Sequence, residues 1–338
     1  MKYIVSHDYD VSLVKKISPS MAYDGKEDFS LWQKKAREKL TELLGLDTFV
    51  KCDDALNIIS EKDCGEYTKI DFEFQSEENY FVPCSMLVPK GITKPIPGAI
   101  CLQGHSTGMH ISLGEPKYEK DEASIAGGRD FAVQAVKEGY CAIAMEQRYM
   151  GVCGHVEDAG TPICQKHGST AILIGRTVAG ERAWDVSRLI DLIEKHFTNY
   201  IDMKKIICMG NSGGGTTTFY ASCLDERIHL SMPSCAVCTY DDSIIALPHC
   251  RCNYVPNIRK YFEMGDLLGL IVPRKLVVVS GIEDTIFPIK HALECTDKVR
   301  PLYEKFGNTA FCHHIQGNGG HQFYPLDAWP VVKDILNK

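Results

Sequence analysis

Short apolar segments alternate with helix-like segments over most of this 338-residue chain, and this alternation constrains the fold more than any other feature. The apolar segments predict strands at 98–104, 140–145, 206–210, 229–237, 275–281 and 309–316. Helical patterns lie at 129–137, at 177–197, directly after Ser212, at 290–305 and at 327–336. Strands that alternate with helices form a parallel sheet that the helices cover on both faces. The segment KLVVVSG at 275–281 is almost wholly apolar, as is typical of a strand buried on both sides.

Two further strand patterns precede this series, at 68–75 and 80–89, and the polar residues 76–79 separate them. They predict an antiparallel hairpin at an edge of the sheet. A hairpin followed by a series of parallel strands is the α/β-hydrolase arrangement. We therefore expect an α/β-hydrolase fold with a mostly parallel central sheet and helices on both faces.

The chain before the hairpin carries an amphipathic helix at 29–44, which Gly45 ends. We expect residues 1–64 to form an N-terminal helical extension that packs on the core, and residues 65–338 to form the catalytic domain. The segment 239–271 lies between two predicted strands and is rich in Tyr, Cys, Asn and Pro. It is a candidate cap insertion.

The pentapeptide Gly210-Asn211-Ser212-Gly213-Gly214 lies between a predicted strand and a predicted helix. In this Gly-x-Ser-x-Gly turn, the serine adopts strained backbone torsions, and the flanking glycines allow the strand and the helix to approach closely. The pentapeptide alone is a weak signal, because Gly/Ser-rich turns are common. Its place between a strand and a helix predicts that Ser212 is a nucleophile.

A serine nucleophile needs a base and an acid that orients this base, and in this fold the chain order is Ser, Asp or Glu, then His. Asp284 follows the strand at 275–281; its neighbour Glu283 is the alternative, with a helix cap as its structural role. His321 lies in a glycine-rich loop after the last strand. His313 and His314 are alternatives, but both fall within that strand. Asp284 and His321 are the preferred pair.

An acyl-transfer site also needs backbone N–H groups that stabilise the developing oxyanion. The N–H of Gly213, at the start of the helix, is the expected first donor. The loop QGHSTG at 103–108 follows the strand at 98–104 and should supply the second, from the N–H of His105. The competing interpretation of this loop is a plain glycine turn.

The charge and the cysteines exclude other classes of protein. The formal net charge of −7 is spread along the chain without a Lys/Arg cluster, so no nucleic-acid partner is expected. We find no signal-peptide pattern and no apolar run long enough for a membrane span, and expect a cytoplasmic protein without a membrane partner.

The odd count of 15 cysteines favours buried free thiols. The pairs at 235/238 and 250/252 have awkward spacing for zinc, so neither a metal nor a cofactor is expected.

A long loop is expected between 146 and 175, where Arg148 would hold the loop through a salt bridge more readily than it would bind substrate.

With these residues in place, the chain resembles the acetyl xylan esterase and dienelactone-hydrolase-related branch of the α/β-hydrolases. The resemblance rests on the turn around Ser212 and on two longer stretches, 175–193 and 249–289, and it departs at Gln103, where many relatives have histidine. It implies metal-free hydrolysis of small carboxylic esters, often acetyl groups on sugars. A serine peptidase or amidase, and a non-catalytic binding protein, are the alternatives. The sequence leaves a homo-oligomer open.

Overall fold

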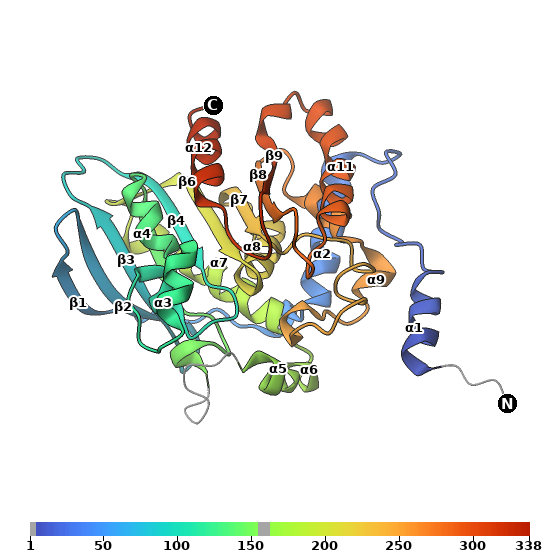
Figure 1. The fold of residues 1–338 in the computed structure, drawn as a ribbon, viewed down its shortest axis with the longest axis horizontal. Helices are drawn as coiled ribbons and strands as arrows, with labels where there is room; N and C mark the ends of the chain where they lie inside the picture. Colours follow the sequence, from blue (N-terminus) through green and yellow to red (C-terminus); the bar gives the residue numbers. More distant parts are fainter. Residues whose placement is uncertain (1–4, 155–162) are drawn as a thin grey trace.

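Nine strands form one twisted sheet at the centre of the structure, a computed structural model that describes residues 5–154 and 163–338 (Figure 1). The sheet order is β1-β2-β3-β5-β4-β6-β7-β8-β9. The strands are β1 (Asn57–Asp63), β2 (Tyr67–Glu77), β3 (Tyr80–Pro89), β4 (Ile96–Leu102), β5 (Cys141–Met145), β6 (Ile201–Asn211), β7 (Ile228–Ser234), β8 (Lys275–Gly281) and β9 (Cys312–Gly317). Strands β4 to β9 pair in parallel, whereas β1, β2 and β3 pair antiparallel. The α/β-hydrolase fold with a mostly parallel sheet is confirmed.

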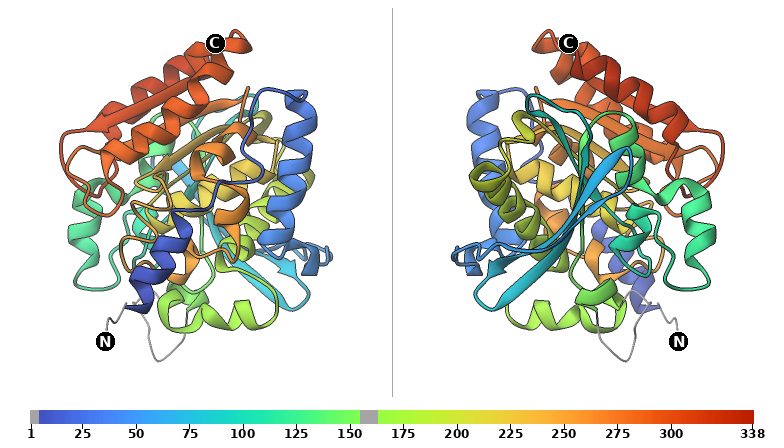
Figure 2. Two further views of the ribbon diagram at one scale, coloured as in Figure 1. Left: turned by 90° about the vertical axis from the view of Figure 1, so that its right-hand side faces the viewer. Right: turned by 90° about the vertical axis from the view of Figure 1, so that its left-hand side faces the viewer.

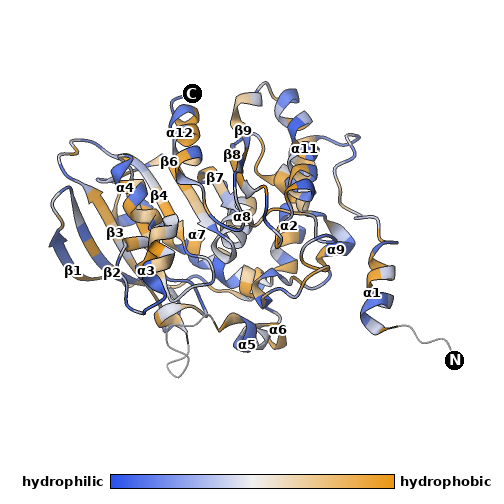
Figure 3. Ribbon diagram, in the orientation of Figure 1, coloured by the Kyte–Doolittle hydropathy of each residue, from blue (hydrophilic) through white to orange (hydrophobic). Residues whose placement is uncertain are grey.

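Helices cover both faces of this sheet (Figure 2). The apolar side chains of α4 (Phe131–Lys137) and α12 (Pro325–Leu336) pack in one core. Those of α2 (Phe29–Leu43), α7 (Val178–His196), α8 (Gly213–Leu224) and α11 (Ile289–Lys305) pack in the core on the other face. Apolar residues dominate the central strands β3, β4 and β6 (Figure 3), because these strands are buried between the two helical layers.

The N-terminal part contributes both a helix and a strand. Helix α2 packs on the core through Trp32, whose indole lies against Gly269, and Gln33 Nε2 donates to the carbonyl of Val272 at 2.6 Å. Strand β1 lies within the range 1–64 that was expected to be helical, so the sheet begins before residue 65. Every residue of β1 is exposed. An edge strand without a buried face has no apolar alternation, which is why the pattern did not predict it.

The connections at the carboxyl ends of the strands contain short helices. Between β7 and β8 these are η6 (Arg251–Asn253), α9 (Ile258–Tyr261), α10 (Met264–Leu267) and η7 (Leu268–Leu270). The segment expected as one loop between 146 and 175 contains η4 (Gly151–Cys153), α5 (Cys164–His167) and α6 (Ser169–Leu173). Residues 155–162 of that segment lie outside the described residues. In the described part of the chain, no helix has the length and apolar content needed to cross a membrane.

The first turn after β5 is held by a buried ion-pair network around Arg148. Arg148 Nε lies 2.8 Å from Asp185 Oδ2, and Arg148 Nη2 lies 2.7 Å from Glu77 Oε1. The guanidinium also lies over the ring of Tyr80, 4.1 Å from its centroid. Arg148 is 7% exposed. It therefore fixes the turn from within, as the salt-bridge interpretation of this residue predicts.

We expect Arg148→Met to lower the free energy of unfolding by about 3–5 kcal/mol, because it leaves buried carboxylates without their counter-charge. Urea titration followed by circular dichroism measures this loss. The matched control is Arg300→Met, since Arg300 forms an exposed ion pair with Asp297 and its loss should cost under about 1 kcal/mol. Equal losses in the two variants would contradict the buried-network account.

Candidate active site

Ser212 lies at the turn between β6 and α8, at the carboxyl edge of the sheet. Its φ of 56° and ψ of −121° place a non-glycine residue in a strained region. The turn is too tight for other side chains on either side: a Cβ at Gly210 would lie 2.6 Å from the Gly214 carbonyl carbon, and one at Gly214 would lie 2.2 Å from the Leu102 carbonyl oxygen. The strand–turn–helix geometry predicted for Ser212 is therefore present.

Asp284 and His321 meet in the loops that follow β8 and β9. His321 Nδ1 lies 2.8 Å from Asp284 Oδ2, and Asp284 Oδ1 accepts the N–H groups of Ile286 at 2.8 Å and Phe287 at 3.0 Å. Burial alone would raise the pKa of Asp284, but its hydrogen bonds with His321 and with these two amides hold the pKa below its ordinary value. An ionised carboxylate only accepts, so it selects the tautomer with hydrogen on Nδ1 and leaves Nε2 able to accept a proton.

The alternatives to these two residues face elsewhere. Glu283 is exposed, whereas Asp284 is buried beside the ring of His321. His313 Nε2 bonds to the carbonyl of Ala310 at 3.0 Å, and His314 bonds to Thr296 and Ser280. Both rings are thus engaged away from Asp284.

Ser212 and His321 lie at the same edge of the sheet, because parallel strands end there together. In the described part of the chain, the Ser212 hydroxyl and the His321 ring share no hydrogen bond. Such bonds are often long in the absence of substrate and shorten when it binds.

The loop after β4 passes directly against the serine turn. A Cβ at Gly104 would lie 3.1 Å from Ser212 Cβ, and one at Gly213 would lie 3.0 Å from His105 Cε1. The first N–H groups of a helix have no acceptor within the helix, so the N–H of Gly213 is available to a ligand. The structure therefore brings together the two residues expected to supply oxyanion donors. Burial lowers the pKa of His105 to about 3, so its imidazole is neutral.

Gln103, the departure from the family pattern, anchors this loop. Its Nε2 donates to Ser112 Oγ at 2.7 Å and to the carbonyl of Arg129 at 2.6 Å, and its carbonyl accepts from Gln147 Nε2. Thr217 of α8 in turn donates to Gln147 Oε1 at 2.7 Å. The side chain of Gln103 thus links the loop to the rest of the fold.

Sequence reasoning missed several neighbours of His321. The ring of Phe287 stacks on that of His321, and the ring of His249 packs edge-on against Phe287 at a centroid distance of 5.3 Å. The thiol of Cys235, directly after β7, lies within 4.8 Å of the facing atoms of Asp284 and His321. No local signal indicated this, because Cys235 falls within the strand predicted at 229–237, whereas β7 ends at Ser234.

The cysteines differ from expectation at one place. Cys164 and Cys250 form a disulfide, so the prediction that all cysteines are free thiols is wrong for this pair. The other cysteines are free. The two partners are 86 residues apart in sequence, and no local spacing could have paired them.

Glu146, directly after β5, is a buried carboxyl behind the loop that carries His105. Its Oε2 accepts the N–H of Met109 at 3.2 Å, and Gly151 packs so closely that a Cβ there would lie 2.0 Å from this oxygen. Burial raises the pKa of Glu146 from 4.5 to about 7 despite the hydrogen bonds from the N–H groups of Met109 and Gln147.

Because the pKa of Glu146 is raised, the free energy of unfolding should fall as the pH rises from about 4.5 to 7. Between about pH 4.5 and 7 the folded state keeps a proton that the unfolded state has released, so unfolding becomes easier as the pH rises. We expect Glu146→Gln to remove about 3 kcal/mol of this pH dependence. Melting temperatures at pH 5 and pH 8 for both proteins measure it. If the melting temperature changes by the same amount between pH 5 and pH 8 in the wild type and in the variant, Glu146 is not the source of the pH dependence.

This fold and its strand–turn–helix serine define an α/β-hydrolase, and comparison with known proteins agrees. The sequence profile of the Abhydrolase family matches residues 1–314, and the chain belongs to this family. YtaP of Bacillus subtilis (strain 168), described as a hydrolase, is 20% identical over 248 residues, which cover 71% of this chain and 77% of YtaP.

Solved structures share the fold at low sequence identity. A Bacteroides fragilis protein described as an acetyl xylan esterase has a TM-score of 0.79 and 18% identity, over 94% of this chain and 83% of that one. A glucuronoyl esterase from Solibacter usitatus has a TM-score of 0.71 and 17% identity, over 94% of this chain and 98% of that one. These likenesses establish the common fold.

Proposed function

We propose that the protein is a serine carboxylesterase that hydrolyses small esters, acetyl esters of carbohydrates foremost among them. Ser212 attacks the ester carbonyl, His321 accepts the serine proton, and Asp284 orients and stabilises the imidazolium. The N–H groups of Gly213 and His105 bind the oxyanion. Collapse of the tetrahedral intermediate releases the alcohol with a proton from His321. Water activated by His321 then hydrolyses the acyl-enzyme.

The observation that carries this proposal is the strained Ser212 at the same sheet edge as the His321–Asp284 pair. The carbohydrate part rests on the resemblance to acetyl xylan esterases and on the fold shared with carbohydrate esterases. We further propose that the segment 239–271 forms a wall of the substrate pocket, because its His249 packs against Phe287 beside the base. Most cysteines are free thiols, which favours a reducing compartment such as the cytoplasm.

A substrate panel tests the reaction class. We expect the full chain to hydrolyse p-nitrophenyl acetate and acetylated xylo-oligosaccharides, with kcat/KM falling for longer acyl chains. Aminoacyl amides should be poor substrates. Faster cleavage of the amides than of the esters would replace the esterase proposal with an amidase, and no hydrolysis of any panel member would refute both.

A further inference from the structure

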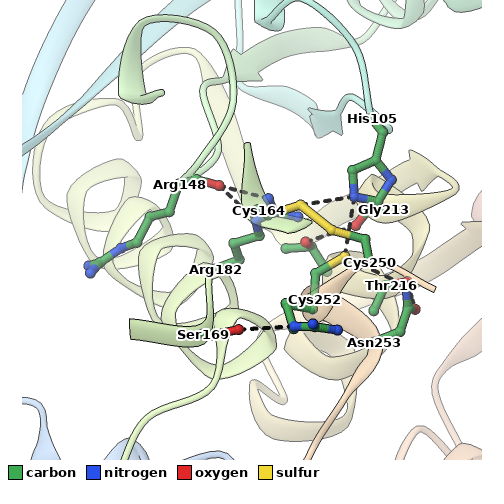
Figure 4. The surroundings of a disulfide bond; sticks show 12 residues. His105, Arg148, Cys164, Ser169, Arg182, Gly213, Thr216, Cys250, Cys252 and Asn253 are labelled. Atoms are coloured by element: carbon green, nitrogen blue, oxygen red, sulfur yellow. Dashed lines mark hydrogen bonds between the residues drawn. A yellow bond between two sulfur atoms is a disulfide. The ribbon is translucent and has the colours of Figure 1, made fainter. Parts of the chain in front are cut away.

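Four side chains that bind soft metal ions converge beside the serine turn. The Nε2 atom of His105 and the sulfur atoms of Cys164, Cys250 and Cys252 all lie within 4.8 Å of one another. His105 Nε2 is 3.1 Å from Cys164 Sγ and 3.4 Å from Cys252 Sγ. Figure 4 shows these groups facing one another around the disulfide. They come from the loop after β4, from the start of α5 and from the turn at η6.

A disulfide alone does not require this arrangement. The bond joins Cys164 and Cys250, yet the Cys252 thiol, two residues along the chain from Cys250, and the His105 ring, from the loop after β4, also point at it (Figure 4). Cys252 is 1% exposed and Cys164 is fully buried. His105 and Cys250 are half-buried, and the four groups together have the composition of a Cys3His zinc site.

A buried arginine beside these four side chains indicates that the cluster can carry a negative charge. Arg182 is fully buried and contacts the Cys252 thiol. Its Nε and Nη2 donate to the carbonyl of Arg148 at 3.0 and 2.7 Å, whereas its Nη1 has no partner among the described residues. Within residues 5–154 and 163–338, no carboxylate forms an ion pair with Arg182. An isolated buried guanidinium is costly, so a negative group at the cluster would stabilise it.

We propose that His105, Cys164, Cys250 and Cys252 bind one Zn²⁺ when the disulfide is reduced. A dithiol reductant converts the Cys164–Cys250 bond to two thiols and is itself oxidised to a disulfide. The three cysteine thiols then release three protons as their thiolates bind the ion, and the neutral imidazole supplies the fourth ligand. Three thiolates and one Zn²⁺ carry a net charge of −1, which the Arg182 guanidinium balances. Thiolate ligands select zinc over hard cations.

Four protein ligands leave no open position, so the ion has a structural role. It would fix three segments around the serine turn: the His105 loop, the start of α5 and the turn at η6. The last of these already contacts α8, because Thr216 Oγ1 donates to Asn253 Oδ1 at 2.9 Å. Zinc would thus hold these three segments around Ser212, whichever reaction takes place there.

Metal content tests this proposal directly and without an activity assay. The full chain is purified with dithiothreitol, supplied with ZnCl₂, desalted, and analysed by atomic emission. We expect about one zinc ion per chain. Loading with Co²⁺ instead should give the visible bands of a tetrahedral ion and strong thiolate-to-cobalt charge-transfer absorption. Reduced wild type that retains no zinc and shows no such absorption would overturn the proposal.

One variant distinguishes a metal site from a disulfide that His105 and Cys252 merely contact. Cys252→Ala leaves both disulfide partners in place but removes a ligand, so we expect the zinc content to fall at least tenfold. Cys295→Ala is the matched control, because Cys295 is equally buried but lies in α11, away from the cluster. Equal zinc in the two variants would contradict the site. Should Cys252→Ala not fold, the cobalt spectrum of the wild type still decides the question.

Discussion

Replacing Ser212 with alanine is expected to lower kcat for p-nitrophenyl acetate by a factor on the order of 10⁶, with the fold intact. In the proposed mechanism Ser212 Oγ forms the acyl-enzyme, so its removal leaves only the oxyanion donors and substrate binding to accelerate the reaction. Alanine and serine both carry a Cβ and have similar backbone preferences, so the substitution should leave the strained turn at position 212 in place. Steady-state kinetics and circular dichroism measure both parts of the prediction.

The control for this variant is Ser30→Ala, because Ser30 is an exposed serine of α2 and lies outside the turn around Ser212. It should keep wild-type kcat. A Ser212→Ala protein that is folded and retains more than a few per cent of the activity would remove Ser212 from the mechanism.

The second large effect is expected for Asp284→Asn, which should lower kcat by about 10⁴-fold. An amide can donate to His321 Nδ1 and so stabilise the wrong tautomer, with hydrogen on Nε2, where the proton of Ser212 must go. The variant also loses the charge that stabilises the imidazolium. The rate at high pH should recover in part, as hydroxide replaces the base.

Glu283→Gln provides the matched control, since it changes the neighbouring carboxylate, which is exposed, whereas the Asp284 carboxylate bonds to the ring. We expect kcat within about twofold of wild type, as for most surface substitutions. The reverse outcome, a severe loss for Glu283→Gln and a mild one for Asp284→Asn, would assign the acid to Glu283.

The sequence predicted the central strands well, because their signal is strong and local. Strands such as β8 are buried on both faces and consist of apolar runs between turn residues. The placement of Ser212, Asp284 and His321 followed from topology, since each lies just beyond a strand of the parallel sheet. The tight turn around Ser212 was also visible, because only glycine tolerates the close contacts at 210 and 214.

What the sequence could not predict depends on contacts between distant segments. Strand β1 has no buried face and thus no hydrophobic pattern. The cluster of His105, Cys164, Cys250 and Cys252 takes its members from three loops, and only the Cys-x-Cys pair was visible locally. The spacing of that pair alone argued against zinc, whereas the fold brings His105 and Cys164 beside it, which the proposed zinc site requires. The packing of His249 on Phe287 likewise follows from the fold of the 239–271 segment.

The most direct test of the central claim, that Ser212 is an activated nucleophile, is covalent labelling with a fluorophosphonate followed by peptide mapping. Such a reagent reacts with a serine hydroxyl only where a base removes its proton and an oxyanion site stabilises the adduct. The account predicts one adduct per wild-type chain, located on Ser212, and none on Ser212→Ala. An unlabelled wild type, or equal labelling of the two proteins, would contradict it.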